Sequence, residues 1–178
     1  MACELALHIP ELEELWYRQQ LMEDPETMHY NRGYTLPFAG YDPETGCIPF
    51  PPDQWEGWYR QFVCGGPERF YAYLVRVEDG VFVGEVNLHK SGQHPWYEIG
   101  IVLEGKHRGR GYAAPGLQLL LEYAFQTLGA PAVHNDFEET RQAAVRLHLN
   151  AGFQICKREH GLMELLITRE QFLERGVT

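Results

Sequence analysis

The chain has 178 residues, 44% of them hydrophobic and 22% charged, so it can bury the core of one domain and is not composed like a disordered protein. Its formal net charge of -10 at pH 7 argues against the basic face of a nucleic-acid-binding domain. No run approaches the roughly 18–20 apolar residues of a membrane span, and the N-terminus lacks a basic region followed by an apolar run, so we expect a cytoplasmic protein without nucleic-acid or membrane partners.

The cysteines lie far apart and form no CxxC pair. They are Cys3, Cys47, Cys64 and Cys156. This spacing is typical of reduced, mostly structural thiols, so we expect neither a disulfide framework nor a zinc site, and no metal in the mechanism.

The first third of the chain is expected to be helical and aromatic. Residues 9–24 and 51–63 carry apolar side chains at helical spacing, and Pro52 or Asp53 suits the start of the second helix. Between them the chain is irregular and rich in proline and glycine. The aromatic residues of this N-terminal third either wall an amine-binding cleft or form the core of a substrate-side portion; they are Tyr30, Tyr34, Phe38, Tyr41, Trp55, Trp58 and Tyr59.

From Arg69 the hydrophobic period changes to two, which indicates strands. Residues 69–77, 81–90 and 96–104 form an antiparallel meander with turns at 78–80 and 91–95. Closing the second hairpin places Asn87 opposite Glu98 and His89 opposite Trp96. Alternation then separates a polar face from an apolar one: Glu85, Asn87, His89, Trp96 and Glu98 against Phe82, Val86, Leu88, Tyr97 and Ile99.

The last third alternates helices and strands. The pattern predicts a helix at 114–129, a strand at 131–137, a helix from Glu138 that ends at Gly152, two strands around a 159–161 turn, and a helix at 169–176. This order indicates a single α+β or mixed α/β domain with helices packed on a mostly antiparallel sheet.

The stretch KHRGRGYA, residues 106–113, lies between a predicted strand and a predicted helix. Gly109 and Gly111 can adopt positive φ and leave the backbone N–H groups open, and a helix start adds its positive dipole end. Four basic side chains raise the local potential further: Lys106, His107, Arg108 and Arg110. The combination predicts a pyrophosphate site, with a solvated basic turn as the plain alternative.

Two other nucleotide motifs fit less well. The P-loop string GxxxxGK[ST] does not occur. Gly109, Gly111 and Ala114 match the dinucleotide-binding pattern GxGxxA, and Asp136 follows the next strand. However, the stretch EGKHR, residues 104–108, precedes the first glycine where a dinucleotide fold turns at once, and the preceding strands are antiparallel.

Arg108-x-x-Gly111-x-Ala113 resembles the [QR]-x-x-G-x-[GA] loop of the GNAT superfamily of acetyl-CoA-dependent N-acetyltransferases. The likeness covers the order of elements from 69 to 168 and is nearest the RimJ/RimL-type branch. It implies a GNAT-like fold whose sheet splays between the fourth and fifth strands and carries helices on both faces. Residues 1–68 would form the substrate side and 69–178 the acetyl-CoA-binding core, and a homodimer is the family's default.

The resemblance also implies where acetyl-CoA binds. Ile101, Val102 and Leu103 would hold the pantetheine arm, with the N–H of Val102 as the oxyanion donor. Asn135 or Arg141 would replace a family asparagine that contacts the cofactor. The pyrophosphate would be bound by the loop, namely Arg108, Gly109, Arg110, Gly111, Tyr112 and Ala113.

Three residues are candidates for catalysis. Glu98 has nearly the family spacing for a general base, and Glu85 is its partner on the polar face. His148 stands where many members carry a tyrosine acid; it either donates a proton to the thiolate or is an exposed helix histidine. We expect direct acetyl transfer to a primary amine. A non-catalytic acyl-CoA-binding domain and a dinucleotide-dependent oxidoreductase are the alternatives.

Overall fold

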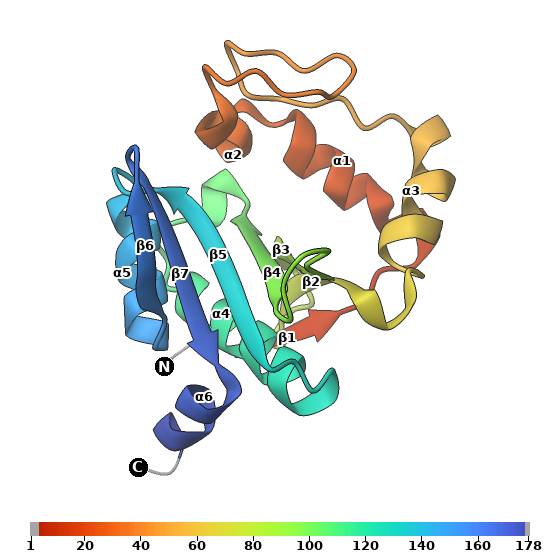
Figure 1. Ribbon diagram of the computed structural model, residues 1–178. Coiled ribbons are helices and arrows are strands. Elements are labelled where there is room, and N and C mark those ends of the chain that lie inside the picture. The colour runs from red at the N-terminus through yellow and green to blue at the C-terminus, as the bar shows by residue number, and fades with distance from the viewer. Residues whose placement is uncertain (1–3, 177–178) are drawn as a thin grey trace.

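The computed structural model describes residues 4–176, and its strands run over Leu5–His8 (β1), Arg69–Arg76 (β2), Phe82–Lys90 (β3), Tyr97–Leu103 (β4), Ala132–Glu138 (β5), Gln154–Glu159 (β6) and Leu162–Thr168 (β7). They form one sheet in the order β1-β2-β3-β4-β5-β7-β6 (Figure 1). Every neighbouring pair is antiparallel except β4 and β5, which are parallel. The predicted mixed, mostly antiparallel fold is confirmed.

Helices cover both faces of this sheet (Figure 1). They are Trp16–Glu23 (α1), Pro25–Met28 (α2), Trp55–Phe62 (α3), Ala113–Glu122 (α4), Gln142–Ala151 (α5) and Arg169–Arg175 (α6). Short 3-10 turns lead into α1 and α3, and a π-helical turn, Tyr123–Thr127, extends α4. Within residues 4–176, no helix combines the length and apolar character needed to cross a membrane.

Two apolar clusters hold the helices to the sheet. On one face, Leu117, Leu120 and Leu121 of α4 are fully buried against strand residues of the main core. On the other face, Tyr17 and Leu21 of α1 pack against tyrosines of β2. The N-terminal third is therefore a layer on the sheet face opposite α4, and burial of these side chains supplies most of the attachment.

The two parallel strands separate soon after they meet. Pairing between β4 and β5 is limited to Tyr97 with Val133 and Glu98 with His134. Beyond that point β4 continues beside β3, while β5 continues beside β7. The splay expected between the fourth and fifth strands is therefore present, and it leaves the edges of both strands facing a gap.

The hairpin register differs from the prediction by two residues. Asn87 pairs with Gly100, and His89 pairs with Glu98. The loop is wider than expected. Ser91 N donates to Trp96 O, so Pro95, which has no N–H to donate, stays in the turn. A shift of two preserves the faces, so the polar set stays together.

Phe82 lies on the opposite face from the predicted one. A register irregularity between β2 and β3 pairs Leu74 with Gly84 but Val75 with Phe82. The extra residue turns Phe82 toward Tyr17 and Tyr73, with ring centroids 5.2 and 4.9 Å away. Bulges of this kind are not visible in a hydrophobic pattern.

Other element boundaries also differ. The sequence analysis missed β1, which has only four residues and pairs at the edge of the sheet with β2. It also missed α2, inside the segment expected to be irregular. Helix α5 begins at Gln142 rather than near Glu138, because Glu138 still pairs in β5 and Arg141 has a non-helical ψ of 68°.

Candidate functional site

A cavity of about 860 Å³ opens where β4 and β5 separate, and the N-terminal third closes its other side. Most of the residues predicted for the site line it: Glu85, Ile101, Val102, Leu103, Arg108, Gly109, Ala113, Asn135, Arg141 and His148. The remaining predicted residues, Glu98, Arg110, Gly111 and Tyr112, are not among its lining residues. The structure thus gathers residues from β3, β4, β5, α5 and the glycine loop around one space.

The glycine loop keeps its backbone open. Gly109 and Gly111 have φ of +72° and +84°, and a Cβ built on either would meet nothing within 4 Å. Within residues 4–176, the N–H groups from Gly109 to Tyr112 have no protein acceptor, whereas Arg108 N donates to Gly105 O. Helix α4 begins directly afterwards without a side-chain cap. These unpaired N–H groups at a helix start are what binding of a diphosphate requires.

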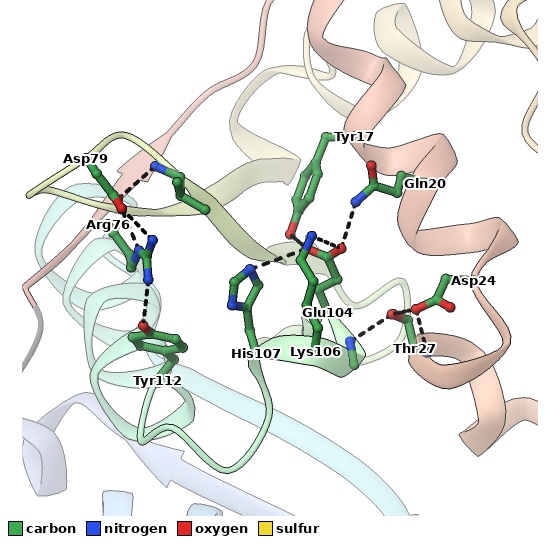
Figure 2. A network of polar contacts seen from close by, with 12 residues as sticks. Tyr17, Gln20, Asp24, Thr27, Arg76, Asp79, Glu104, Lys106, His107 and Tyr112 are labelled. Carbon is green, nitrogen blue, oxygen red and sulfur yellow. Dashed lines mark hydrogen bonds and ion pairs between the residues drawn. The ribbon is translucent and has the colours of Figure 1, made fainter.

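The basic side chains of this loop are mostly engaged elsewhere. Arg108 donates to the carbonyls of Glu26 and Thr27 in α2, at 2.9 and 2.6 Å. Lys106 and His107 turn toward Glu104 (Figure 2). Lys106 and Arg110 are both exposed, but of the four basic residues only Arg110 has no ion pair or hydrogen bond among the contacts described for residues 4–176. The expected concentration of positive charge is therefore smaller, and the backbone carries more of the anion site.

Glu104 ties the N-terminal helices to the end of β4 (Figure 2). Its buried carboxylate accepts hydrogen bonds from Tyr17 at 3.1 Å and Gln20 at 2.7 Å, both in α1. The next amide, Gly105 N, donates to Thr27 Oγ1 of α2 at 2.9 Å. The loop and the helices across the cavity are thus held in one fixed arrangement.

The backbone of β4 offers its free N–H groups at alternate residues. Glu104 N donates to Val83 O of β3 at 3.0 Å, and N–H groups alternate sides along an antiparallel strand. The N–H of Val102 therefore faces β3, whereas those of Ile101 and Leu103 face the gap. The expectation that Val102 supplies the oxyanion donor is wrong on this register. Val102 nevertheless lines the cavity.

Glu85 is buried and paired with a residue that the sequence analysis missed. Arg18 of α1 donates to both of its carboxylate oxygens, at 2.6 and 2.8 Å, and Tyr71 also donates to it. The guanidinium of Arg18 stacks 4.2 Å from the Trp58 ring centroid. Arg18 could have been noticed as a charged residue on the apolar stripe between Leu15 and Met22.

Glu98 lies on the same sheet face but outside the cavity. Trp96 Nε1 donates to one oxygen and His134 Nδ1 to the other, each at 2.7 Å. Glu85 and Glu98 therefore have separate partners rather than each other. The role of Glu98 as base stays a prediction.

His148 is buried, with 2% of its surface exposed, so the alternative of an exposed helix histidine is wrong. Its Nδ1 bonds to Ala144 O at 2.8 Å and its Nε2 to Asn135 Nδ2 at 2.9 Å. Because a carbonyl only accepts, Nδ1 carries the proton and Nε2 accepts from the amide. Burial lowers the pKa of His148, which favours this neutral form. The ring is placed to orient Asn135.

Two aromatic residues of the N-terminal third, Tyr30 and Phe38, line the cavity. The guanidinium of Arg141 lies 5.4 Å from the Tyr30 ring centroid, and burial raises the pKa of that phenol. The other aromatics of the predicted set are not lining residues; among them, Tyr34 donates to Glu138 at the end of β5. Tyr30 and Phe38 are thus part of a cavity wall, whereas Trp58 packs against the cluster of Tyr17; that the cavity binds an amine stays a prediction.

The sequence matches the family described as acetyltransferase (GNAT) domain over residues 6–154. No curated protein matches it. Among solved structures, spermidine N-acetyltransferase from Vibrio cholerae in complex with CoA and spermine is 18% identical, with a TM-score of 0.75 over 95% of this chain and 98% of that one. FdhC, a nucleotide-linked sugar GNAT, is 17% identical, with a TM-score of 0.72 over 97% and 91%. A GNAT-family acetyltransferase from Bacillus anthracis is 18% identical, with a TM-score of 0.69 over 96% and 98%.

Proposed function

Because this chain belongs to the GNAT acetyltransferase family and uses acetyl-CoA as its acyl donor, we propose that it transfers the acetyl group directly to a primary amine held in the cavity. The observation that carries the proposal is the row of unpaired N–H groups from Gly109 to Tyr112. They lie at the start of α4, beside a cavity between two separated strands. The sheet of a dinucleotide-binding fold is mostly parallel, whereas among the strands of residues 4–176 only β4 and β5 pair in parallel.

The described groups suit each part of acetyl-CoA. The pyrophosphate would accept from the loop amides, with Arg110 and Arg141 adding charge that is not committed to a carboxylate. The pantetheine arm would pair with the gap-facing N–H groups of Ile101 and Leu103, as an added strand does. One of those two N–H groups would also donate to the thioester oxygen as charge develops there.

The transfer step would use Glu85 and Tyr30 as the groups that exchange protons with the reacting atoms. The amine nitrogen attacks the thioester carbon, the carbon–sulfur bond breaks, and the thiolate leaves. Before the attack, Glu85, the carboxylate that lines the cavity, would take one proton from the ammonium, directly or through water; after the attack, the nitrogen would release a second proton to solvent water. The thiolate would take its proton from Tyr30, a cavity-lining phenol that is protonated at neutral pH and would regain its proton from solvent water. His148 would position Asn135 rather than act as the acid.

The acceptor is proposed only as a primary amine. One similar structure holds spermine and another is described as a nucleotide-linked sugar GNAT, so the shared fold accommodates different acceptors. The likeness to the RimJ/RimL-type branch, a homodimer and a cytoplasmic location stay predictions. The absence of the family's tyrosine in α5 favours the non-catalytic alternative, but Tyr30 brings a phenol to the same cavity from the N-terminal third.

Release of free thiol from acetyl-CoA over a panel of amines tests the proposal. We expect amine-dependent release and a loss of about 100-fold in kcat for Glu85→Gln, the size of a general-base contribution. Glu98→Gln should lose less than Glu85→Gln, because Glu98 lies outside the cavity. Circular dichroism and acetyl-CoA binding would show that each variant is folded. Tight binding of acetyl-CoA without thiol release for any amine would support the non-catalytic alternative instead.

A further inference from the structure

A second cluster of reactive side chains lies outside the cavity. It comprises His134 of β5, Cys156 of β6 and Glu164 of β7, and one ligand atom from each lies within 4.8 Å of the other two. We propose that this cluster binds a divalent transition-metal ion, with Zn²⁺ as the expected occupant. The proposal is independent of the acetyl-transfer chemistry.

The imidazole of His134 is held in the form that a metal needs. The side chain is 6% exposed, and its Nδ1 lies 2.7 Å from Glu98 Oε2. A carboxylate fixes the proton on Nδ1 and leaves a lone pair on Nε2. Metal-bound histidines commonly have such a carboxylate behind them, because it orients the ring and strengthens the ligand. Stacking with Trp96, at 4.9 Å between ring centroids, further fixes the ring.

The Nε2 atom of His134 is buried and has no hydrogen-bond partner. The atom facing it at 3.5 Å is Glu164 Oε2, itself an acceptor when ionised. Two acceptors that face each other without a proton between them are unfavourable when buried. A cation between Nε2 and Oε2 would satisfy both, and at this position it is either a metal ion or the second proton of an imidazolium.

A β-bulge brings the sulfur to the same place. Ile155 pairs with Leu165 but Lys157 pairs with Glu164, so Cys156 is the extra residue in β6. Its thiol lies 3.4 Å from the Glu164 carbonyl oxygen. Bulges re-aim single side chains, and this one places Cys156 on the face that carries His134 and Glu164.

The donor set matches zinc. One imidazole nitrogen, one thiolate and one carboxylate are all ordinary Zn²⁺ ligands at about 2.0–2.3 Å, which puts the ligand atoms of a tetrahedral site roughly 3.3–3.8 Å apart. The separation of Nε2 and Oε2, 3.5 Å, is already in that range. Lys157 Nζ contacts Glu164 through the other oxygen, Oε1, at 3.8 Å, and so leaves Oε2 available. The fourth position would hold water.

The absence of a CxxC pair made a zinc site unexpected from the sequence. The three ligands come from separate strands, and no two of them are close enough in the chain to form a recognisable motif. Only the pairing of β5 with β7 and of β7 with β6 brings them together.

Metal titration of the purified apoprotein, without acetyl-CoA, tests the proposal. We expect one Zn²⁺ per chain by calorimetry, and Co²⁺ should give a thiolate-to-cobalt charge-transfer band in the near ultraviolet. Cys156→Ser should lose the band and bind Zn²⁺ at least 10-fold more weakly. Cys64→Ser, which removes another exposed thiol, should behave like the parent protein.

Glu164→Gln provides a second variant whose side chain is partly exposed and which should also bind Zn²⁺ at least 10-fold more weakly. The proposal is overturned if the parent protein gives no band and no stoichiometric binding, or if Cys156→Ser and Glu164→Gln bind as the parent does. Because the readout is metal binding, either result leaves the acetyl-transfer proposal unaffected.

Discussion

Gly111 illustrates how a single backbone conformation supports the anion site. Its φ of +84° is costly for any residue with a Cβ, although the space around it is open. A substitution there would alter both the conformation of the loop and the direction of its N–H groups. Gly80, in the turn between β2 and β3, has a φ of +70° and equally open surroundings.

We expect Gly111→Val to weaken acetyl-CoA binding by at least 10-fold, measured by calorimetry, because the loop amides would no longer converge. Gly80→Val is the matched control: it should cost a similar 1–2 kcal/mol of stability but leave binding unchanged. Equal affinities for the two variants would show that the loop does not hold the cofactor.

His148 gives a prediction on pH dependence. Burial lowers its pKa below the ordinary 6.5, so the unfolded chain takes up a proton at a higher pH than the native protein. The stability that the neutral ring contributes is complete above pH 6.5 and decreases as the pH falls below that value, by at most about 1.4 kcal/mol per pH unit. The free energy of unfolding, measured with urea at several pH values between 7.5 and 5.5, should decrease less steeply with falling pH for His148→Gln than for the parent protein.

His160 provides the control for that experiment. It lies in the exposed turn between β6 and β7, with 91% of its side chain accessible and a φ of 52° that asparagine tolerates. His160→Asn should show the same pH dependence of the free energy of unfolding as the parent protein. If His148→Gln also keeps it, the buried ring does not stay neutral as we infer.

At the scale of elements, the glycine loop and α2 form one unit. Arg108 donates to α2 carbonyls, Gly105 donates to Thr27, and an added Cβ at Gly105 would come within 2.5 Å of the Glu26 side chain. The first basic residue of the family motif therefore anchors a helix here, while its neighbour Arg110 faces solvent. Two side chains of the same loop, two positions apart, therefore have different roles: one stabilises the packing of α2, and the other is free to contribute charge to the anion site.

Arg108→Ala and Arg110→Ala separate those tasks. The first should lower the free energy of unfolding by about 2 kcal/mol, since it removes charge-assisted hydrogen bonds to the carbonyls of Glu26 and Thr27, and should speed amide exchange in residues 25–31. The second should leave stability within about 0.5 kcal/mol but weaken acetyl-CoA binding about five-fold. Denaturation and calorimetry on the same two proteins measure both effects, and a reversed pattern would contradict the assignment.

At the scale of the molecule, the N-terminal third and the strand-rich remainder meet around the cavity. Arg18 and Glu85 join them on one side, and Tyr34 and Glu138 join them at the end of β5. Residues from 4–68 thus contribute one wall of the cavity. A single domain is the organisation that this supports.

Ligand-linked unfolding tests that organisation. Acetyl-CoA at 100 times its Kd should stabilise the native protein by about 2.7 kcal/mol. The corresponding rise in Tm is roughly 5–10 °C for a chain of this size, in one cooperative transition, and NADH should produce none. Two transitions, of which only one moves, would show that the N-terminal third unfolds by itself.

The sequence alone determined the features that depend on neighbouring residues. Gly109 and Gly111 before a leucine-rich stretch predicted the anion loop, and strand alternation predicted the polar face of β3 and β4, because turn chemistry and side-chain periodicity are local properties. The resemblance of the loop and the order of elements identified the family.

The tertiary structure decided which side chains meet. Three contacts depend on strand register, on bulges and on where β4 separates from β5. They join Arg18 to Glu85, Asn135 to His148, and His134 to Cys156. A register shift of two kept the predicted faces. Two separate bulges did not: one extra residue in β3 moved Phe82 across the sheet, and one in β6 brought Cys156 to His134. Such contacts join residues far apart in the chain, and their free energy depends on the packing of the whole fold, which no local pattern contains.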